Sequence, residues 1–399
     1  MAKERVCVIG LGYIGLPTAA LLANRGFQVH GVDVVKHVVE TINEGRIHIV
    51  EPDLDTFVRS AVNSGNLKAD IKPTSADIFI IAVPTPFKDD YVPNIDYVVS
   101  ATQSIAPYVA EGNIIILEST SPVGTTQIVG ETLAACGLDI STLHIAHCPE
   151  RVLPGRIMIE LVENDRIVGG LTPEATQKTA DFYRSFVMGE VLQTDAKTAE
   201  MAKLTENSFR DVNIAFANEL SILCDKFGIN VWELIALANR HPRVNILQPG
   251  CGVGGHCIAV DPWFIVHKGG DDAKLIRSAR EVNNRKTHWV VDKIITTAQN
   301  FETLHGRRPK IACMGLAFKP DIDDLRESPA LEITQDLHAQ GCDIIAVEPH
   351  ITSHPSLTIT DTAVAVMDAD IVVFLVKHKV FRYLSLQDKI VLDFCHVMS

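Results

Sequence analysis

The chain has 399 residues, of which 47% are hydrophobic and 21% are charged, and its formal net charge is −13. This length favours two or three globular domains, and no apolar run approaches the roughly 20 residues that a membrane-spanning helix needs. The acidic balance argues against nucleic-acid and anionic-membrane partners, because both require a positive surface.

The N-terminus leads directly into a predicted strand. Residues 1–5 precede the apolar stretch 6–10, which leaves no room for a signal peptide and predicts a cytoplasmic protein. The nine cysteines are scattered without any C-x-x-C pair. We therefore expect reduced thiols and no metal site.

Short apolar strands alternate with amphipathic stretches of helix length in the first half of the chain. This pattern predicts a parallel sheet built from βαβ units. The candidate strands are 6–10, 28–33, 78–85, 114–120 and 143–149.

A glycine motif, G-x-G-x-x-G, connects the first strand to a helical stretch. Gly10 permits the tight turn, Gly12 lets the backbone approach a pyrophosphate, and Gly15 allows the helix to pack closely. Asp33 ends the next strand, 23 residues after Gly10. A carboxylate there accepts hydrogen bonds from a ribose and repels a 2′-phosphate, so the motif predicts an NAD site rather than an NADP site.

One long connecting helix is predicted over residues 196–227, which contain neither proline nor glycine. Lys203 and Asn207 are four residues apart and project from one face together with Arg210. An ammonium and an amide that converge there would suit an oxyanion, although Lys203 could equally lie on a solvated face. The helix is also apolar at many positions that need a covering surface, including Ile214, Phe216, Leu220 and Leu223.

A glycine-rich loop at 252–262 carries the candidate nucleophile, Cys257. The glycines would expose this thiol, and the carboxylate of Asp261 lies close enough in sequence to serve as a base. A cysteine can also be a small core residue. A metal site made of Cys251, His256 and Cys257 is a further alternative, but it lacks a fourth ligand and the usual zinc spacing.

A second set of apolar strands follows the basic segment 306–309, and the candidates are 310–318, 343–348, 371–376 and 390–394. This region looks like a degenerate repeat of the first, because residues 314–317 resemble 9–12 and Glu348 ends the next strand as Asp33 does. The other glycines of the motif are missing. We therefore expect a second α/β domain that binds no second dinucleotide.

Several motifs follow the glycine motif in a fixed order. They are VPTP at 83–86, STSPVG at 119–124, PER at 149–151, KLTEN at 203–207, GGHC at 254–257, GLAFKP at 315–320 and RES at 326–328. This series resembles the UDP-glucose/GDP-mannose dehydrogenase family over essentially the whole chain. The resemblance implies an α/β protein with two Rossmann-like, doubly wound domains joined by a long central helix. It further implies an NAD-binding domain at 1–195, a central region at 196–305 that forms a homodimer, and a UDP-sugar-binding domain at 306–399.

The resemblance also implies roles for individual residues. Cys257 matches the family's nucleophile, and Lys203 matches its acid/base or oxyanion-stabilising lysine. Asn207 would share the oxyanion, and Asp261 matches the general base. Thr120 and Glu150 match residues that position water. The positions that hold NAD are Gly10, Gly12, Tyr13, Ile14, Gly15, Asp33, Thr85, Thr126 and Arg326. The positions that line the sugar-nucleotide site are Arg151, Val152, Lys203, Asn207, Arg210, His241, Arg243, Gly254, Phe318 and Lys319.

Two departures from the UDP-glucose branch bear on the substrate. Pro154 stands where that branch carries a second glutamate, and His256 stands where it carries serine. Both are typical of the bacterial enzymes for 2-acetamido sugars. The proline removes the second glutamate as a group that could activate water. The resemblance at Ala259 and Trp263 favours UDP-N-acetyl-D-mannosamine as the substrate, and the family resemblance implies a four-electron oxidation at C6. UDP-N-acetylglucosamine and UDP-glucose stay open as substrates, as do a two-electron hydroxyacid dehydrogenase and a non-catalytic NAD-binding regulator.

Overall fold

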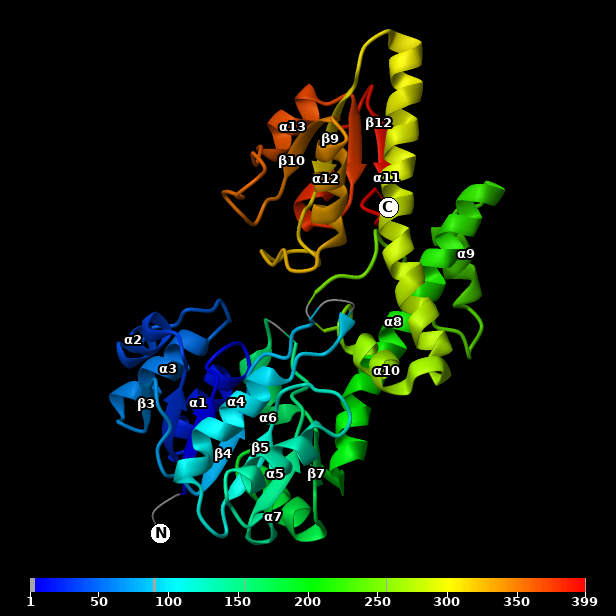
Figure 1. The fold of residues 1–399 in the computed structure, drawn as a ribbon. Coiled ribbons are helices and arrows are strands. Elements are labelled where there is room, and N and C mark those ends of the chain that lie inside the picture. The colour runs from blue at the N-terminus through cyan, green and yellow to red at the C-terminus, as the bar shows by residue number, and fades with distance from the viewer. Residues whose placement is uncertain (1–3, 89–90, 154, 256, 399) are drawn as a thin grey trace. The chain divides into compact units, whose positions relative to one another are not determined.

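The computed structural model describes residues 4–88, 91–153, 155–255 and 257–398. The chain divides into two compact units (Figure 1). The first contains Met1–Thr205 and Trp263–Lys268, and the second contains Glu206–Pro262 and Gly269–Ser399. Two helices continue from one unit into the other: α8 (Ala196–Phe227) and α10 (Asp261–Gly269).

An eight-stranded sheet forms the first unit in the described part of the chain, in the order β3-β2-β1-β4-β5-β6-β7-β8. The strands are β1 (Arg5–Ile9), β2 (Gln28–Val32), β3 (Leu67–Asp70), β4 (Ile78–Ile81), β5 (Ile114–Leu117), β6 (His144–His147), β7 (Arg166–Gly170) and β8 (Val191–Asp195). All five predicted strands are confirmed. The sequence patterns missed β3, β7 and β8, which are short or carry polar residues, and the antiparallel pairing of β6 with β7.

Successive residues of the central strands pack into cores on opposite faces of this sheet. Ile78 and Ile80 belong to one core, whereas Phe79 and Ile81 belong to the other. The first core is covered by α1 (Gly15–Asn24), α2 (Lys36–Asn43), α3 (Leu54–Asn63), α6 (Ile157–Glu163) and α7 (Pro173–Arg184). The second is covered by α4 (Asp96–Ile105) and α5 (Thr125–Ala135). Burial on both faces explains why these strands are continuously apolar.

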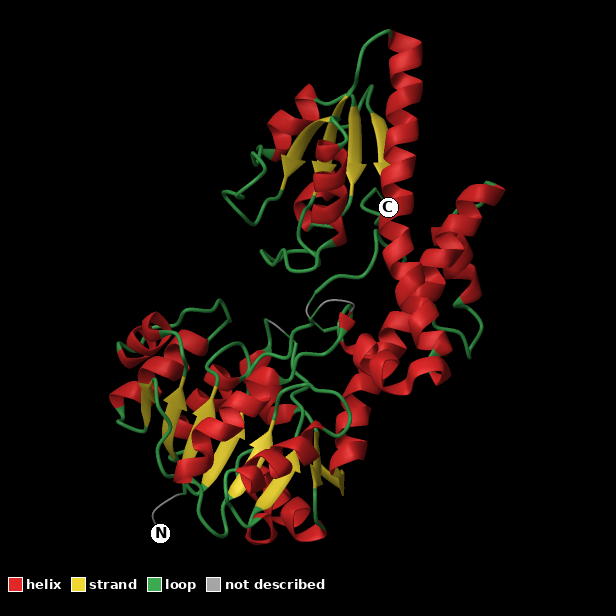
Figure 2. Cartoon of the chain, viewed as in Figure 1, coloured by secondary structure: helices red, strands yellow, loops and turns green. Residues whose placement is uncertain are grey.

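The second unit contains a parallel sheet of four strands in the order β10-β9-β11-β12 (Figure 2). The strands are β9 (Lys310–Met314), β10 (Asp343–Val347), β11 (Ile371–Phe374) and β12 (Ile390–Asp393), and each was predicted. Helices α11 (Lys274–His305) and α12 (Pro329–Ala339) share a core on one face, and α13 (Thr362–Asp368) packs in a core on the other. A short helix, α9 (Val231–Ala238), also belongs to this unit.

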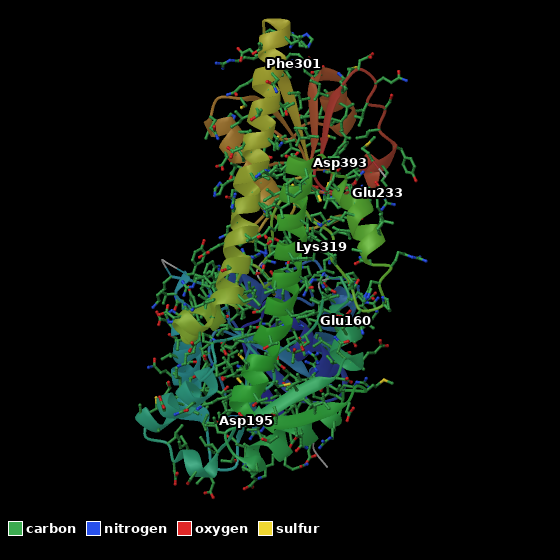
Figure 3. All side chains as sticks on the ribbon, turned by 90° about the vertical axis from the view of Figure 1, so that its right-hand side faces the viewer. Glu160, Asp195, Glu233, Phe301, Lys319 and Asp393 are labelled. Atoms are coloured by element: carbon green, nitrogen blue, oxygen red, sulfur yellow. The ribbon has the colours of Figure 1, made fainter. Side chains whose placement is uncertain are left out.

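Helix α8 is one continuous helix with the predicted bounds, and its second half packs along α11 (Figure 3). Asp211 and Arg280 form a buried ion pair between the two helices, with 2.7 Å between Oδ1 and Nη1. Asn218 donates a hydrogen bond to Asn283 at 2.9 Å. None of the helices in the described residues combines the length and apolar character that a bilayer crossing requires.

Candidate active site

The glycine motif forms a tight loop between β1 and α1. Gly10 has φ +91°, and a Cβ on it would lie 2.5 Å from the carbonyl oxygen of Ala82. A Cβ on Gly15 would lie 1.8 Å from the carbonyl oxygen of Gly10, whereas a Cβ on Gly12 would meet nothing within 4 Å. The fold itself therefore requires Gly10 and Gly15, and Gly12 leaves the space through which a pyrophosphate approaches the backbone.

Asp33 is held beside this loop by backbone groups. Its Oδ2 accepts a hydrogen bond from the N–H of Leu11 at 3.0 Å, and its Oδ1 accepts one from Val35 at 2.9 Å. The carboxylate stays partly exposed, and Tyr13 and Ile14 of the glycine loop are half-buried. The first turn of α1 carries no acidic residue, so its N–H groups and dipole favour an anion. These features fit the ribose and pyrophosphate of NAD.

Three threonines predicted near the cofactor or the reacting groups lie in the first unit. Thr85 donates its hydroxyl to the carbonyl of Thr120 at 2.6 Å. Thr126 is fully buried in the first turn of α5, where its N–H and its hydroxyl donate to Glu200 at 2.7 and 2.6 Å. Glu200 lies on α8 and also accepts from the N–H of Gly124. It therefore caps α5, a role that the sequence analysis missed.

Glu150 follows β6 and is 5% exposed. One of its oxygens accepts from Arg166 at 2.5 Å and the other accepts from the N–H of Arg151 at 2.6 Å. The carboxyl of Glu118 is also buried, and it accepts from the hydroxyl of Tyr183 at 2.7 Å. Burial, together with the charge of Glu150, raises the pKa of Glu118 to about 7. The sequence motifs singled out neither Arg166 nor Tyr183, and they passed over Glu118 as a catalytic candidate.

The structure brings Asn207, Cys257 and Asp261 together in the second unit. Asn207 donates its amide to Oδ2 of Asp261 at 2.5 Å, and the N–H of Asp261 donates to the carbonyl of Cys257 at 2.8 Å. Asp261 is 3% exposed, whereas Cys257 is partly exposed. Lys203 lies half-buried on α8, one turn before Asn207, and Arg210 on the same helix is exposed.

The loop before Cys257, residues 252–255, packs closely against Phe318 and Glu327, which follow β9. A Cβ on Gly254 would lie 2.3 Å from the carbonyl oxygen of Glu327, and a Cβ on Gly255 would lie 2.8 Å from the ring of Phe318. The N–H of Gly255 donates to the carbonyl of Arg326 at 3.2 Å. These glycines are therefore needed for packing within the protein.

The alternative metal set contains a core residue. Cys251 is buried, its Sγ donates to the carbonyl of Leu375, and burial raises its pKa to about 12. His256, the second member of that set, lies outside the described residues, as does Pro154.

The predicted sugar-nucleotide residues are divided between the units. The first unit holds Arg151 and Val152, and the second holds Arg210, His241, Arg243, Gly254, Phe318 and Lys319. Lys319 is exposed, and Figure 3 labels it. Arg326 forms an ion pair with Asp324 at 2.6 Å. His241 and Arg243 share an exposed turn after α9.

Ala259 and Trp263 pack inside the protein. They are 8% and 7% exposed, and the ring of Trp263 stacks on that of Tyr91 with 4.2 Å between the centroids. Their influence on substrate choice would therefore act through the placement of neighbouring loops.

The glycine loop and the partly exposed Asp33 at the carboxyl edge of a doubly wound sheet define a dehydrogenase that uses NAD. Models of three domains match this chain: an NAD binding domain at 4–187, a central domain at 197–285 and a UDP binding domain at 312–399. The chain belongs to the UDP-glucose/GDP-mannose dehydrogenase family, and it is an NAD-dependent oxidoreductase.

Individual relatives cover nearly the whole chain. A UDP-N-acetyl-D-mannosamine dehydrogenase from Campylobacter jejuni is 56% identical over 98% of this chain and 99% of its own length. An NDP-N-acetyl-D-galactosaminuronic acid dehydrogenase from Ralstonia nicotianae is 54% identical over 97% of this chain and 95% of its own length. The solved structure of a UDP-D-ManNAc dehydrogenase from Pyrococcus horikoshii aligns with a TM-score of 0.92 at 38% identity, covering 99% of this chain and 96% of that one.

Proposed function

We propose that this enzyme oxidises the C6 hydroxymethyl group of UDP-N-acetyl-D-mannosamine to a carboxylate, giving UDP-N-acetyl-D-mannosaminuronate. The observation that carries this proposal is the partly exposed Cys257 beside the buried pair of Asp261 and Asn207, in a chain 56% identical to an enzyme named for that sugar. NAD, when bound, supplies the hydride acceptor for both oxidations. Asp33 and the glycine loop hold it, with the proposed help of Thr85, Thr126 and Arg326.

Cys257 retains the intermediate between the two oxidations. Its thiolate adds to the C6 aldehyde, forming a C–S bond and an alkoxide, which takes up a proton as a thiohemiacetal. Loss of hydride from C6 and of the hydroxyl proton gives a thioester. Water then adds to the thioester carbonyl, and the C–S bond breaks to release the carboxylate and restore the thiol. Covalent capture divides a difficult oxidation into easier steps.

The groups around Cys257 supply charge stabilisation and a base. Lys203 and Asn207 stabilise the oxyanions, since an ammonium and an amide donor both favour negative charge. Asp261 accepts protons as the general base. The hydrogen bond that its Oδ2 accepts from Asn207 supports this role, because it fixes the carboxylate in the first turn of the helix that follows Cys257. Thr120 and Glu150 are proposed to position the water.

The sugar nucleotide is proposed to bind through basic and apolar groups from several segments. Lys319 and Arg243 meet the charge of UDP, since a chain with a net charge of −13 needs local positive groups to attract an anion. The remaining contacts are assigned to Arg151, Val152, Arg210, His241, Gly254 and Phe318. These assignments divide the chain into an NAD region at 1–195, a central region at 196–305 and a UDP-sugar region at 306–399.

The enzyme is further proposed to be a homodimer formed through α8. Phe209, Phe216 and Leu223 recur every seven residues on this helix and are 70%, 54% and 39% exposed. A stripe with this spacing lies along one side of a helix and is suited to another helix. The nine cysteines are scattered without any C-x-x-C pair, which supports a cytoplasmic location.

A second candidate substrate is the N-acetyl-D-galactosamine counterpart. It is favoured by the relative from Ralstonia nicotianae, whose identity to this chain is only slightly lower than that of the mannosamine enzyme. Both substrates would use the same chemistry at C6, so the distinction rests on contacts to the sugar ring.

A panel of UDP-sugars, assayed for NADH release, tests the proposal. UDP-N-acetylmannosamine should give a higher kcat/KM than its galactosamine and glucosamine isomers and than UDP-glucose, with two NADH formed per uronate. A higher kcat/KM for UDP-N-acetylgalactosamine would establish the second candidate. A comparable kcat/KM for UDP-glucose would contradict the assignment to 2-acetamido sugars.

A further inference from the structure

The two Rossmann-like sheets place a carboxylate at equivalent positions. In the first unit, the N–H of Gly10 donates to the carbonyl of Val32 at 2.8 Å, at the end of β2. The next residue, Asp33, accepts from Leu11 through one oxygen and from the N–H of Val35, two residues on, through the other.

Glu348 makes the same set of bonds in the second unit. The N–H of Gly315 donates to the carbonyl of Val347 at 2.8 Å. Glu348 then accepts from Leu316 through Oε2 at 2.8 Å and from the N–H of His350, two residues on, through Oε1 at 3.1 Å. Glu348 therefore occupies, in the second sheet, the place of the ribose-binding aspartate in the first.

The surroundings of the two carboxylates differ. Asp33 is partly exposed, whereas Glu348 is 2% exposed. Oε2 of Glu348 also accepts from the N–H of Ala317 at 2.9 Å and lies 3.1 Å from Nε2 of His378, which is fully buried. Burial by itself raises the pKa of Glu348, but the hydrogen bonds from His378 and the loop N–H groups lower it below the ordinary value. This carboxylate is therefore an ionised internal acceptor.

The hydrogen bonds of His378 define its tautomer. Nδ1 accepts from the N–H of Asp321 at 3.0 Å, so the ring proton lies on Nε2 and is donated to Glu348. Asp321 has φ +61°, which is unusual for a residue other than glycine. Its side chain accepts from the N–H of Lys379 at 3.0 Å. Asp321 thus donates one hydrogen bond to His378 and accepts another from Lys379, so two bonds connect it to this segment.

Together these bonds hold both ends of the loop 315–321. Glu348 binds the loop at Leu316 and Ala317, and His378 binds it at Asp321. Between the two ends stand Phe318 and Lys319. The ring of Phe318 packs against Gly255, two residues before Cys257, and Lys319 extends into solvent.

We propose that Glu348 and His378 are positioning residues for the sugar nucleotide. By fixing the ends of the loop, they present Lys319 to the charge of UDP and hold Phe318 against the cysteine loop. The role of Lys319 rests on the proposed function. UDP binding in this part of the chain is supported by the match of a UDP binding domain to residues 312–399.

The test compares His378→Leu with His378→Gln in the full-length enzyme. Leucine removes both bonds, and displacement of the loop should weaken UDP binding between about tenfold and a hundredfold, as small misplacements of binding groups do. Glutamine can donate to Glu348 through its amide nitrogen and accept from Asp321 through its oxygen, so it should restore most of the affinity. Calorimetry with UDP and fluorescence titration with NADH measure the two affinities, and the affinity for NADH should stay unchanged in both variants.

His354→Leu is the matched control. His354 is half-buried and accepts a hydrogen bond from the N–H of Ser356, so the same substitution breaks a backbone-to-histidine bond outside the loop 315–321 in the same unit. It should leave the affinity for UDP unchanged. If His378→Leu fails to fold by circular dichroism, Glu348→Gln provides the test, because it keeps the volume and removes one acceptor from a site with four donors.

Three outcomes would overturn the proposal: wild-type affinity for UDP in folded His378→Leu, wild-type affinity in Glu348→Gln, or a loss in His378→Gln as large as in the leucine variant. Binding is measured without turnover. A wild-type enzyme that binds UDP but does not oxidise UDP-N-acetylmannosamine would therefore sink the proposed function and leave this test valid.

Discussion

Among individual residues, burial separates the candidate nucleophile from cysteines that pack in the cores. Burial raises the pKa of Cys7 to about 11 and those of Cys148, Cys251 and Cys313 to about 12. These thiols stay protonated at neutral pH and are poor nucleophiles. Cys257 stays partly exposed, on a loop that precedes a helix N-terminus.

Replacing Cys257 with alanine should separate folding from catalysis. A small change at a partly exposed site should cost about 1 kcal/mol of stability or less. The variant should bind NADH as the wild type does, because Gly12 and Asp33 are unchanged, yet form little or no uronate. NADH release and product analysis measure this. A folded variant that forms two NADH per uronate at near the wild-type rate would exclude the covalent route.

The wild-type protein should lose unfolding free energy as the pH rises, because Glu118 ionises in a buried place. Replacing Glu118 with glutamine should abolish this loss. Since its folded-state pKa is raised from 4.5 to about 7, the folded protein holds this proton more tightly than the unfolded chain. The protonated carboxyl therefore stabilises the folded state fully below pH 4.5. This stabilisation, up to about 3 kcal/mol, is lost as the pH rises through 7. The variant should therefore gain unfolding free energy relative to the wild type across this window. Urea unfolding at acidic and at mildly alkaline pH measures the difference, which would stay constant if Glu118 ionised normally.

Among the elements, the glycine loop contains one glycine that packing requires, Gly15, and one that we expect cofactor binding to require, Gly12. Gly15→Ala places a Cβ 1.8 Å from a backbone oxygen, whereas Gly12→Ala meets nothing within 4 Å. We expect Gly15→Ala to destabilise the protein by about 3 kcal/mol. Gly12→Ala should fold normally and lose affinity for NADH, because its methyl group occupies the path of the pyrophosphate.

Thermal unfolding and NADH titration of both variants check this expectation. The two substitutions are chemically identical and lie three residues apart, so each is the control for the other. Unchanged NADH affinity in Gly12→Ala would remove this position from the cofactor site, and a wild-type Tm for Gly15→Ala would contradict the close approach.

At the scale of the whole molecule, both units place a carboxylate after the second strand of a βαβ segment, but they use it differently. The first leaves Asp33 accessible for a ribose, and the second buries Glu348 against His378. Helices α8 and α10 each contribute residues to both units. Cys257 precedes α10 and Asp261 is its first residue, so the candidate nucleophile and its base lie at the N-terminus of this helix.

Introducing a charge into the exposed stripe of α8 should prevent dimer formation. Phe216→Glu places a carboxylate between Phe209 and Leu223, where it would be desolvated in a helix–helix interface. Sedimentation should show a dimer for the wild type and a monomer for this variant. Lys226→Glu changes the charge outside the stripe and should leave the dimer intact. A wild-type protein that is monomeric at all concentrations would contradict the proposed assembly.

The amino-acid sequence by itself predicted the elements whose signals are local. All nine predicted strands are present, and α8 begins and ends as predicted, because apolar runs and a long stretch without proline or glycine depend only on neighbouring residues. The glycine motif and Asp33 were recognisable for the same reason, since their spacing follows from one βαβ unit.

The buried polar pairs were decided only by the tertiary structure. Hydrogen bonds join Glu118 to Tyr183, Glu200 to Thr126 and Glu348 to His378. These partners are 65, 74 and 30 residues apart in the sequence. The antiparallel placement of β7 likewise depends on its contact with β6. No local sequence pattern identifies such partners. A buried polar group forms hydrogen bonds with the groups that the fold brings close to it, and these can be distant in sequence.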